Sequence, residues 1–302
     1  MIRKATYEDL PALMELFGRA RKIMRESGNL HQWSDDYPSE EIVSKDIENG
    51  VCHVLCQEER IIATMAFIPG PDPTYTEIYD GKWIDDSPYY VIHRIAAAES
   101  GHKAAHRLLM WAFTLTDSIR IDTHKDNVIM KHILGKQGFT YCGVIHLKNG
   151  DPRDAYQLNI KVNKYRALYD TARHYIDGDM IADMANLSAL IHKTFGFWWT
   201  GFYRVIGNEL VLGPFQGPTA CTRIAFGKGV CGSAWKRGET IVVPDVEEFP
   251  GHIACSSESR SEIVVPIWRE GHIVAVLDID SEKLGTFTET DKIWLEKIAS
   301  LI

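Results

Sequence analysis

The chain has 302 residues, of which 45% are hydrophobic and 25% charged, as is usual for a globular protein with room for two domains. Its formal net charge of −8 argues against nucleic acid as a partner. We find no run of about 18 apolar residues that would predict a membrane span, and the first residues, MIRKATYEDL, lack the apolar core of a signal peptide. We therefore expect a cytoplasmic protein whose thiols stay reduced unless they take part in catalysis.

The first half of the chain is predicted to alternate helices and strands. A helix is expected after Thr6, a candidate N-cap with Asp9 as its partner, because apolar residues then recur at helical spacing. The elements expected after it are a hairpin at 52–69, strands at 89–98, 118–124 and 139–147, and helices at 102–115 and 127–137. This alternation predicts an α/β domain over residues 1–162.

The second half has a different pattern. It begins with a mostly helical stretch, residues 165–196, with one break at Gly178. Short strands separated by turn residues are then expected at 199–206, 209–215, 222–226, 240–245, 262–268 and 272–280. A closing helix should start at Thr288, with Asp291 as its capping-box partner. Helices around an antiparallel sheet predict an α+β domain over residues 163–302.

Three cysteines, Cys221, Cys231 and Cys255, fall in one segment of the second domain, the first two in a run of strand and glycine turn. Zinc sites usually pair ligands two to four residues apart, a spacing that these thiols lack, so no metal is expected. A single cysteine in a strand most often acts as a small buried hydrophobic group. Three thiols in one glycine-rich segment instead favour redox chemistry.

Four stretches of the second half carry a resemblance to a known family: NLSALIHKTFGFWWTGFYRV, LVLGPFQGPTACTRIAFGKGVCGSAW, HIACSSESRSEIVVPI and VLDIDSEKLGTFTETD. They resemble the free methionine-(R)-sulfoxide reductases, GAF-fold enzymes that reduce the sulfoxide of the free amino acid. The resemblance runs almost without interruption over residues 166–302, and all three cysteines match the spacing of the family. It implies free methionine sulfoxide as substrate, a thioredoxin-like reductant, and a homodimer paired through helices.

The resemblance also assigns roles to the three thiols. Cys255 takes the place of the nucleophile, whose thiolate attacks the sulfoxide sulfur and becomes a sulfenic acid. Cys221 takes the main resolving place, where it condenses with the sulfenic acid to a disulfide that an external dithiol reduces. Cys231 is an auxiliary thiol, and the sequence leaves open which of Cys221 and Cys231 resolves in practice.

Three acids, Glu262, Asp278 and Asp280, match the carboxylate cluster of the same family. Asp278 and Asp280 alternate on one predicted strand and therefore share a face. Mutual repulsion in such a cluster raises the pKa of some members, so that one can stay protonated and donate to the leaving oxygen while others hold the substrate ammonium. Ordinary solvated acids at a strand end are the alternative.

Trp199 and Tyr203 match the aromatic wall that packs the methyl-sulfinyl end of the substrate in this family. They lie four residues apart on a predicted strand and therefore on one face. An ordinary aromatic core is the alternative, and the neighbouring Phe197, Trp198 and Phe202 are expected to belong to that core.

The first half resembles the GNAT-type N-acetyltransferases through QWSDDYPSEEIVSKDIENG, YYVIHRIAAA and IRIDTHKDNVIMKHILGKQGFTYCGVI. The resemblance implies that acetyl-CoA binds with its pantetheine arm along the strand that holds Ile95 and Ala97. The loop after this strand would offer backbone N–H groups to the pyrophosphate at a helix N-terminus. The cofactor positions expected beyond the strand are Gly101, Lys103, Ala105 and Asn127.

That loop, SGHKAA at 100–105, departs from the family pattern. Lys103 stands where a glycine usually permits close approach of the phosphate. The place of a tyrosine that often acts as general acid is taken by Leu134. Three side chains remain as candidates for acid–base work: Glu77, Asp122 and Tyr141. The domain is therefore either an active acetyltransferase or a degenerate scaffold or sensor module.

The leading hypothesis is a reductase of free methionine (R)-sulfoxide fused to an acetyltransferase-like domain. The alternative is a GAF sensor of a small ligand with a degenerate acetyltransferase scaffold, against which the matched cysteines and acids count. A third hypothesis is a coupled enzyme in which both halves act on amino-acid-like substrates. The acetyl acceptor, the physiological reductant and the oligomeric state are not specified by these residues.

Overall fold

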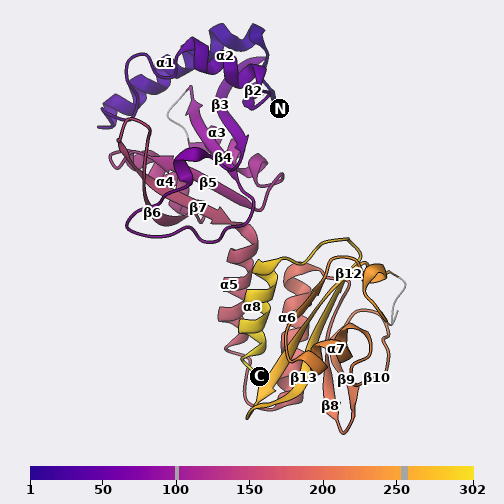
Figure 1. The fold of residues 1–302 in the computed structure, drawn as a ribbon. Coiled ribbons are helices and arrows are strands. Elements are labelled where there is room, and N and C mark those ends of the chain that lie inside the picture. The colour runs from indigo at the N-terminus through magenta and orange to yellow at the C-terminus, as the bar shows by residue number, and fades with distance from the viewer. Residues whose placement is uncertain (99–101, 253–257) are drawn as a thin grey trace. The chain divides into compact units, whose positions relative to one another are not determined.

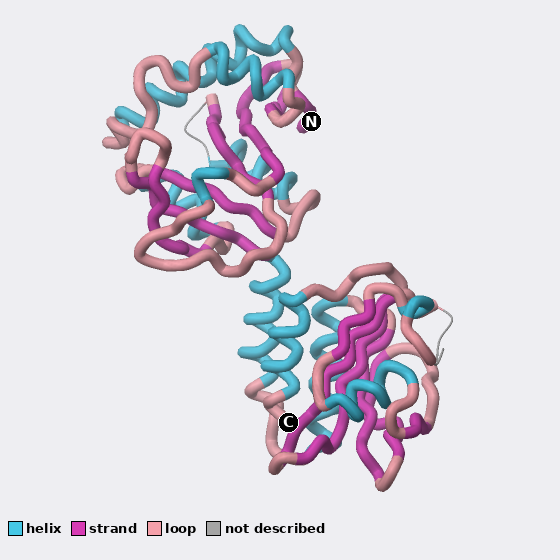
Figure 2. The backbone as a smooth tube through the Cα atoms, in the orientation of Figure 1, coloured by secondary structure: helices cyan, strands magenta, loops and turns pink. Residues whose placement is uncertain are grey.

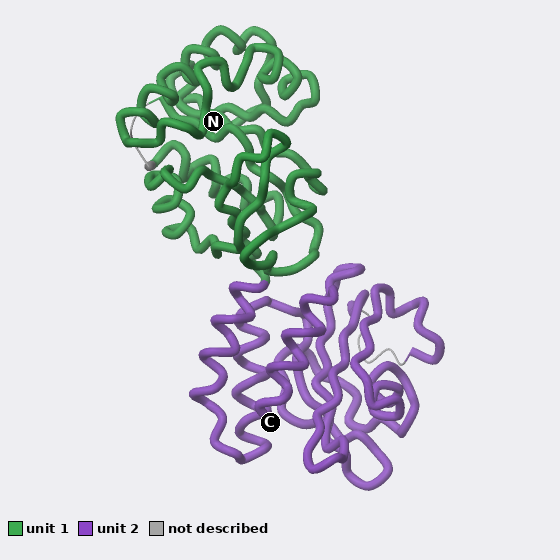
Figure 3. Tube along the Cα trace, turned by 60° about the vertical axis from the view of Figure 1, so that its left-hand side comes forward, with its two compact units in different colours: residues 1–161 green, residues 162–302 purple. Residues whose placement is uncertain are grey.

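The computed structural model describes residues 1–98, 102–252 and 258–302. The chain divides into two compact units, Met1–Lys161 and Val162–Ile302, which Figure 3 draws in separate colours. Each unit contains one sheet and its own buried core. Two residues predicted to belong to sites, Gly101 and Cys255, lie outside the described residues.

A seven-stranded mixed sheet forms the centre of the N-terminal unit, in the order β1-β2-β3-β4-β5-β7-β6 (Figure 1). Its strands are β1 (Ile2–Lys4), β2 (Cys52–Gln57), β3 (Arg60–Pro69), β4 (Tyr90–Ala97), β5 (Ser118–Thr123), β6 (Thr140–His146) and β7 (Pro152–Asn159). Neighbouring strands are antiparallel except β4 and β5, which run parallel. The parallel pairing joins only Tyr90 and Val91 to β5. Beyond Val91, β4 has no partner strand on this side among the described residues, so the sheet opens there.

Helices cover both faces of this sheet. They are α1 (Leu10–Glu26), α2 (Glu40–Glu48), α3 (His102–Ala112) and α4 (Val128–Lys136), with 3-10 turns η1 (Tyr7–Asp9) and η2 (Pro73–Tyr75). Apolar residues of α3 and α4 pack in one core, and those of α1 and α2 in another. The predicted capping box of Thr6 and Asp9 is present, and it opens η1, which leads directly into α1.

Strand β4 carries a bulge where it separates from β5. Its register against β3 shifts between Thr64 and Ala66, and Arg94 adopts φ 52°, in the left-handed region that side chains disfavour. Two hydrogen bonds of 2.7 and 2.8 Å from the Arg94 guanidinium to the Asp46 carboxylate hold this conformation. The bulge therefore fixes the direction of the side chains around it, including His93.

The C-terminal unit is built on a six-stranded antiparallel sheet in the order β10-β9-β8-β13-β12-β11. Its strands are β8 (Trp199–Ile206), β9 (Glu209–Gln216), β10 (Arg223–Ala225), β11 (Ile241–Val243), β12 (Ser261–Arg269) and β13 (His272–Ser281). A short 3-10 turn, η3 (Val246–Glu248), follows β11. The antiparallel α+β class predicted for this half is confirmed.

The two faces of this sheet are covered differently, as Figure 2 shows. On one face lie α5 (Ile160–Ala172), α6 (Met180–Phe195) and α8 (Glu289–Ala299). Side chains such as Phe202 and Leu277 pack in the core on that side, whereas the next residue in β8, Tyr203, packs on the opposite face with α7 (Gly229–Arg237). The period of two along each strand produces this separation. The predicted capping box of Thr288 and Asp291 starts α8.

The prediction of a glycine turn around Cys231 was wrong, because this residue lies in the helix α7. A Cβ atom added at Gly232 would lie 2.5 Å from the Ala225 carbonyl oxygen. The glycine therefore lets the helix pack closely against β10 and does not end it. Helix α2 was not expected either. In the described ranges, no helix has the length and apolar character needed to cross a membrane.

Candidate functional site

Strand register in the C-terminal sheet brings one set of predicted site residues to the face that α7 covers: Trp199, Tyr203, Glu262, Asp278 and Asp280. Asp280 of β13 lies directly opposite Trp199 on β8 and opposite Glu262 on β12. Asp278 shares this face because side chains alternate along the strand. Residues far apart in the sequence therefore meet over three adjacent strands.

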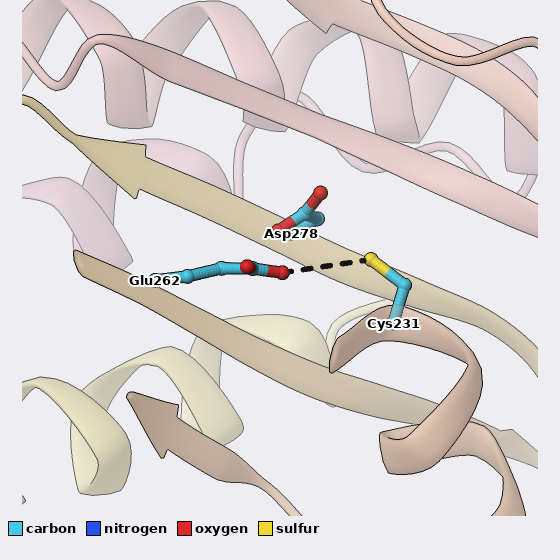
Figure 4. A group of neighbouring side chains, drawn as sticks. All are labelled: Cys231, Glu262 and Asp278. Carbon is cyan, nitrogen blue, oxygen red and sulfur yellow. Dashed lines mark hydrogen bonds between the residues drawn. The ribbon is translucent and has the colours of Figure 1, made fainter. Parts of the chain in front are cut away.

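Helix α7 places Cys231 against the carboxyl groups of Glu262 and Asp278, as Figure 4 shows. The Cys231 thiol donates toward Glu262 Oε1 at a Sγ–O distance of 4.0 Å. One ligand atom from each of Cys231, Glu262 and Asp278 lies within 4.8 Å of the others, and all three residues are buried. Among the described residues, these three bring their ligand atoms close enough together to hold a metal ion.

Burial changes the protonation of the acids. It raises the pKa of Glu262 well above its usual value, and the facing carboxyls of Asp278 and Asp280 raise it further. The same two causes, burial and then Asp280, raise the pKa of Asp278 well above its usual value. Burial raises the pKa of Asp280 to about 6, although a hydrogen bond with Ser259 opposes the rise. The cluster therefore holds protons at neutral pH that exposed carboxylates would release.

The same burial acts on Cys231. It raises the pKa of this thiol well above its usual value, and the charges of Asp278 and Glu262 add to the effect. Because the thiolate is the reactive form of cysteine, Cys231 is not activated as a nucleophile in this arrangement. It is instead a weak donor beneath the acids.

Stacked aromatic rings form one wall of the site. The Trp199 and Tyr203 rings are 5.9 Å apart with an interplanar angle of 26°, and Phe215 stacks on Trp199 at 5.4 Å. The Trp199 indole N–H donates to the Pro218 carbonyl at 3.1 Å, which fixes the ring. Trp199 and Tyr203 are 3% and 1% exposed, so the wall is also part of a buried aromatic layer.

A cavity of about 40 Å³ lies between this wall and the acids. Asp278 Oδ1 is buried there without a hydrogen-bond partner in the part of the chain that the structure describes. A buried carboxyl oxygen without a partner costs free energy unless a ligand supplies a donor. The site is therefore suited to a small molecule that carries an N–H or O–H group.

Sequence reasoning missed two residues that line this cavity, His252 and Ser259. His252 Nε2 lies 3.9 Å from Glu262 Oε2, and burial lowers the pKa of this histidine. The motif that precedes Cys255 contains His252, so a polar residue beside the predicted nucleophile was a signal that could have found it.

The remaining thiols differ in state. Cys221 is part of a disulfide and packs at the edge of the core that contains Cys231. Four other cysteines are in the reduced thiol form: Cys52, Cys56, Cys142 and Cys231. The predicted nucleophile, Cys255, belongs to residues 253–257 outside the described ranges.

In the N-terminal unit, the predicted acetyl-CoA residues do not all lie together. Ile95 and Asn127 line a cavity of about 480 Å³, whereas Lys103 lines a separate hollow between α3 and α4. Ala97 and Ala105 pack in or against the core of α3 and α4. The Asn127 side chain accepts from the Met130 N–H and donates to Gln32, so it caps α4 and holds the wall of the larger cavity.

Only one of the three acid–base candidates, Asp122, lines the larger cavity. Glu77 and Tyr141 are exposed, and neither lines it. Sequence reasoning missed His93, which lies between two carboxylates. Its Nε2 is 2.9 Å from Asp72 Oδ2, and its Nδ1 is 3.7 Å from Asp122 Oδ1. A histidine within the otherwise apolar strand YYVIHRIAAA was the available signal.

Comparisons with known proteins agree with this division. A family model described as GAF domain matches residues 187–302. GAF domain-containing protein A of Dictyostelium discoideum is 55% identical over 155 residues, which cover 49% of this chain and 98% of that protein. The free methionine-R-sulfoxide reductase of Saccharomyces cerevisiae is 47% identical over 131 residues, 40% of this chain and 73% of that enzyme.

The N-terminal unit has a structural neighbour of its own. A GNAT-family acetyltransferase from Streptococcus agalactiae covers 53% of this chain and 94% of its own length, with 34% identity and a TM-score of 0.49. The two relatives of the C-terminal unit match it over most of their own length and are about half identical to it in sequence. Through that unit, the chain belongs to the GAF-domain family of free methionine-R-sulfoxide reductases.

Proposed function

We propose that the C-terminal unit reduces free methionine (R)-sulfoxide to methionine. The observation that carries the proposal is the convergence of a thiol, two buried carboxyl groups and one half-buried carboxyl group beneath a wall of aromatic rings. Sulfoxide reduction needs a proton donor for the oxygen, an apolar wall for the methyl group and thiols for the electrons. The family relationship supports this choice of substrate.

In the first step, the thiolate of Cys255 bonds to the sulfoxide sulfur, and a carboxyl proton passes to the sulfoxide oxygen. Transfer of this oxygen to the cysteine then gives methionine and a sulfenic acid, so the substrate sulfur gains two electrons and the cysteine sulfur loses two. The role of Cys255 rests on the resemblance of its sequence segment.

In the second step, the Cys221 thiol attacks the sulfenic acid sulfur, a disulfide forms and water leaves. A thioredoxin-like dithiol reduces this disulfide by thiol exchange. The oxidised state of Cys221 supports its assignment as the resolving residue. The high pKa of Cys231 supports an auxiliary role for that thiol.

The three acids have different roles in this proposal. Glu262 and Asp278, which hold protons at neutral pH, are the candidates for donation to the sulfoxide oxygen. Asp280, with a pKa of about 6, is largely ionised at neutral pH and can accept the substrate ammonium. Trp199 and Tyr203 would pack the methyl-sulfinyl group.

The test is NADPH oxidation coupled through thioredoxin and thioredoxin reductase, with each epimer of free methionine sulfoxide as substrate. We expect turnover of the R epimer alone, and none with a peptide in which methionine sulfoxide lies between two other residues. Turnover of neither epimer by the reduced protein would contradict the proposal, and tight binding without turnover would favour the sensor.

The opening of the sheet beside β4 favours a second function, acetyl transfer from acetyl-CoA by the N-terminal unit. Beyond Val91, the outward backbone groups of β4 have no strand partner among the described residues, and a pantetheine arm needs such groups. These backbone groups fit the chemistry of acetyl-CoA, which would supply an activated acetyl group as a thioester. The cavity of about 480 Å³ that begins there gives an acceptor room beside it.

Isothermal titration of the full chain with acetyl-CoA tests this second function. We expect binding with a Kd in the micromolar range. Lys103 is the decisive position, because its side chain occupies space that glycine leaves open. If the wild type shows no heat and Lys103→Gly restores binding, the defect lies in this loop. Absence of binding in both would mean that the unit is a scaffold.

A further inference from the structure

Three charged or titratable side chains of the N-terminal sheet point to one cavity. Asp122 of β5 pairs with Ala155 of β7, and Arg153 lies two residues before Ala155 on the same strand. Asp122 and Arg153 therefore share a face as diagonal neighbours, about 7–8 Å apart. His93 lies beside Asp122, and all three residues line the cavity of about 480 Å³.

Arg153 is unusual because its charge is buried without an anion. The residue is only 5% exposed. Its guanidinium donates to two backbone carbonyls, Pro152 at 2.9 Å and Gln32 at 3.4 Å. In the described residues, no carboxylate lies within ion-pair distance of it. Buried arginines are normally paired with an anion, so the remaining donors of Arg153 are available to an anionic group in the cavity.

Asp122 and the nearby Asp72 are acidic, in contrast to the basic Arg153. The Tyr75 hydroxyl donates to Asp122 Oδ1 at 2.7 Å, and Tyr75 is fully buried, so this carboxylate is held in one orientation. Its second oxygen remains able to accept from a cation. On the other side of His93, the Asp72 carboxylate accepts from Thr74 and lies 2.9 Å from the His93 ring.

This arrangement makes His93 a suitable base. With its Nε2 proton donated to Asp72, the neutral imidazole presents a lone pair on Nδ1. That atom is 3.7 Å from Asp122 Oδ1, too far for a hydrogen bond to it. An ammonium group that bridges Nδ1 and Asp122 from the cavity would contact both, and Nδ1 is free to take one of its protons.

We propose that this cavity binds a small molecule that carries both an amine and a carboxylate, such as a free α-amino acid, as the acetyl acceptor. The carboxylate pairs with Arg153, the ammonium lies between Asp122 and His93, and His93 removes the proton. A zwitterion fits because the two opposite charges of the protein share a face without forming a direct ion pair. The proposal rests on the acetyl-transfer function proposed above.

His93 takes one proton from the ammonium, and the amine nitrogen bonds to the thioester carbonyl carbon. The carbon–sulfur bond breaks, the departing thiolate receives a second proton from the nitrogen, and His93 returns its proton to water. The products are the N-acetyl amino acid and the free thiol.

The kinetic test uses the full chain with acetyl-CoA, follows loss of the thioester absorbance, and compares free α-amino acids with their amides. We expect kcat/KM for at least one amino acid to exceed that of its amide by about tenfold or more, the factor that corresponds to about 1.4 kcal/mol. Arg153→Gln should raise KM for the amino acid and abolish this preference. Lys131→Gln is the matched control, because Lys131 pairs with Asp154 next to Arg153 and does not line the cavity.

His93→Gln should lower kcat by roughly 10²-fold, as loss of a general base does, and leave the Kd for acetyl-CoA unchanged. A readout independent of turnover is titration of the full chain with L-leucine, whose heat should be lost in Arg153→Gln. Equal use of amino acids and amides would overturn the proposal and leave acetyl transfer intact. So would an Arg153→Gln variant whose defect lies in KM for acetyl-CoA. If acetyl-CoA does not bind, acetyl transfer fails, and the leucine titration alone decides whether the amino-acid site exists.

Discussion

Glu262 and Asp280 are direct cross-strand partners on β12 and β13, so their two carboxyl groups lie side by side on one face of the sheet. Glu262 is buried and Asp280 is half-buried, and Asp278 adds a third, buried carboxyl group to the same face. Three acids this close cannot all be ionised without a large cost in free energy. The protons that these acids share therefore affect both proton donation to the substrate and the pH dependence of stability.

Glu262→Gln should lower kcat/KM for free methionine (R)-sulfoxide by roughly 10²-fold or more, because the amide cannot donate an acidic proton. Thermal stability should change little, since the glutamate is already neutral in the folded protein at pH 7 by the direction of its pKa shift. Coupled NADPH oxidation measures the activity. Glu209→Gln, an exposed residue paired with Arg223, is the control. Unchanged kinetics in Glu262→Gln would return this residue to a structural role.

The stability of the C-terminal unit should fall as pH rises from about 4 to about 6, because the folded protein keeps the Asp280 proton that the unfolded chain releases near its usual pKa of 3.8. This contribution is fully present below the unfolded pKa and is lost by the folded pKa of about 6. The shift corresponds to roughly 3 kcal/mol. Urea unfolding of wild type and Asp280→Asn across this range checks it. The same pH slope in both proteins would show that Asp280 is not the group concerned.

Cys255→Ser should abolish turnover, because a hydroxyl has no accessible anion near neutral pH and forms no disulfide. Cys221→Ser should release about one methionine per enzyme and then stop as a sulfenic acid. Rapid quench followed by mass spectrometry measures both. Cys56→Ser removes a free, half-buried thiol of the other unit and serves as the control. Multiple turnovers by Cys255→Ser would show that the nucleophile is another residue.

Cys231 should resist alkylation by iodoacetamide in the native protein, since burial suppresses both its access and its thiolate form. The half-buried Cys56 should react first. Peptide mapping after a timed exposure distinguishes them, and unfolding in urea should make the two rates similar. Rapid native labelling of Cys231 would mean that its thiol is more acidic than its surroundings indicate.

Gly232→Ala should destabilise the C-terminal unit by roughly 1–3 kcal/mol, as overpacking of a well-packed core does, because the new methyl group would lie 2.5 Å from the Ala225 carbonyl oxygen. It should also lower reductase activity by moving α7 and Cys231. Gly135→Ala, where a Cβ meets nothing within 4 Å, is the matched helical control and should be neutral or stabilising. Denaturant unfolding of both variants measures the difference.

The sequence by itself determined the fold class of both halves and the identity of the reductase family. Periodicity is a local property, so it predicted the alternation around Asp278 and Asp280, the faces of Trp199 and Tyr203, and the capping box at Thr288. The family motifs are likewise contiguous stretches that can be read without a structure. These features depend on residues near one another in the chain.

Only the tertiary structure decided which residues pack against the predicted faces of these strands and helices. Cys231 was expected in a glycine turn, yet Gly232 allows a helix to pack where a larger residue would collide with β10, a contact that no local pattern records. The pairing of His93 with Asp72 and Asp122, and the isolation of Arg153 from any carboxylate among the described residues, depend on where three strands and η2 come together. Charges act across space and not along the chain, so the cavity that they line became visible only once the strands were paired.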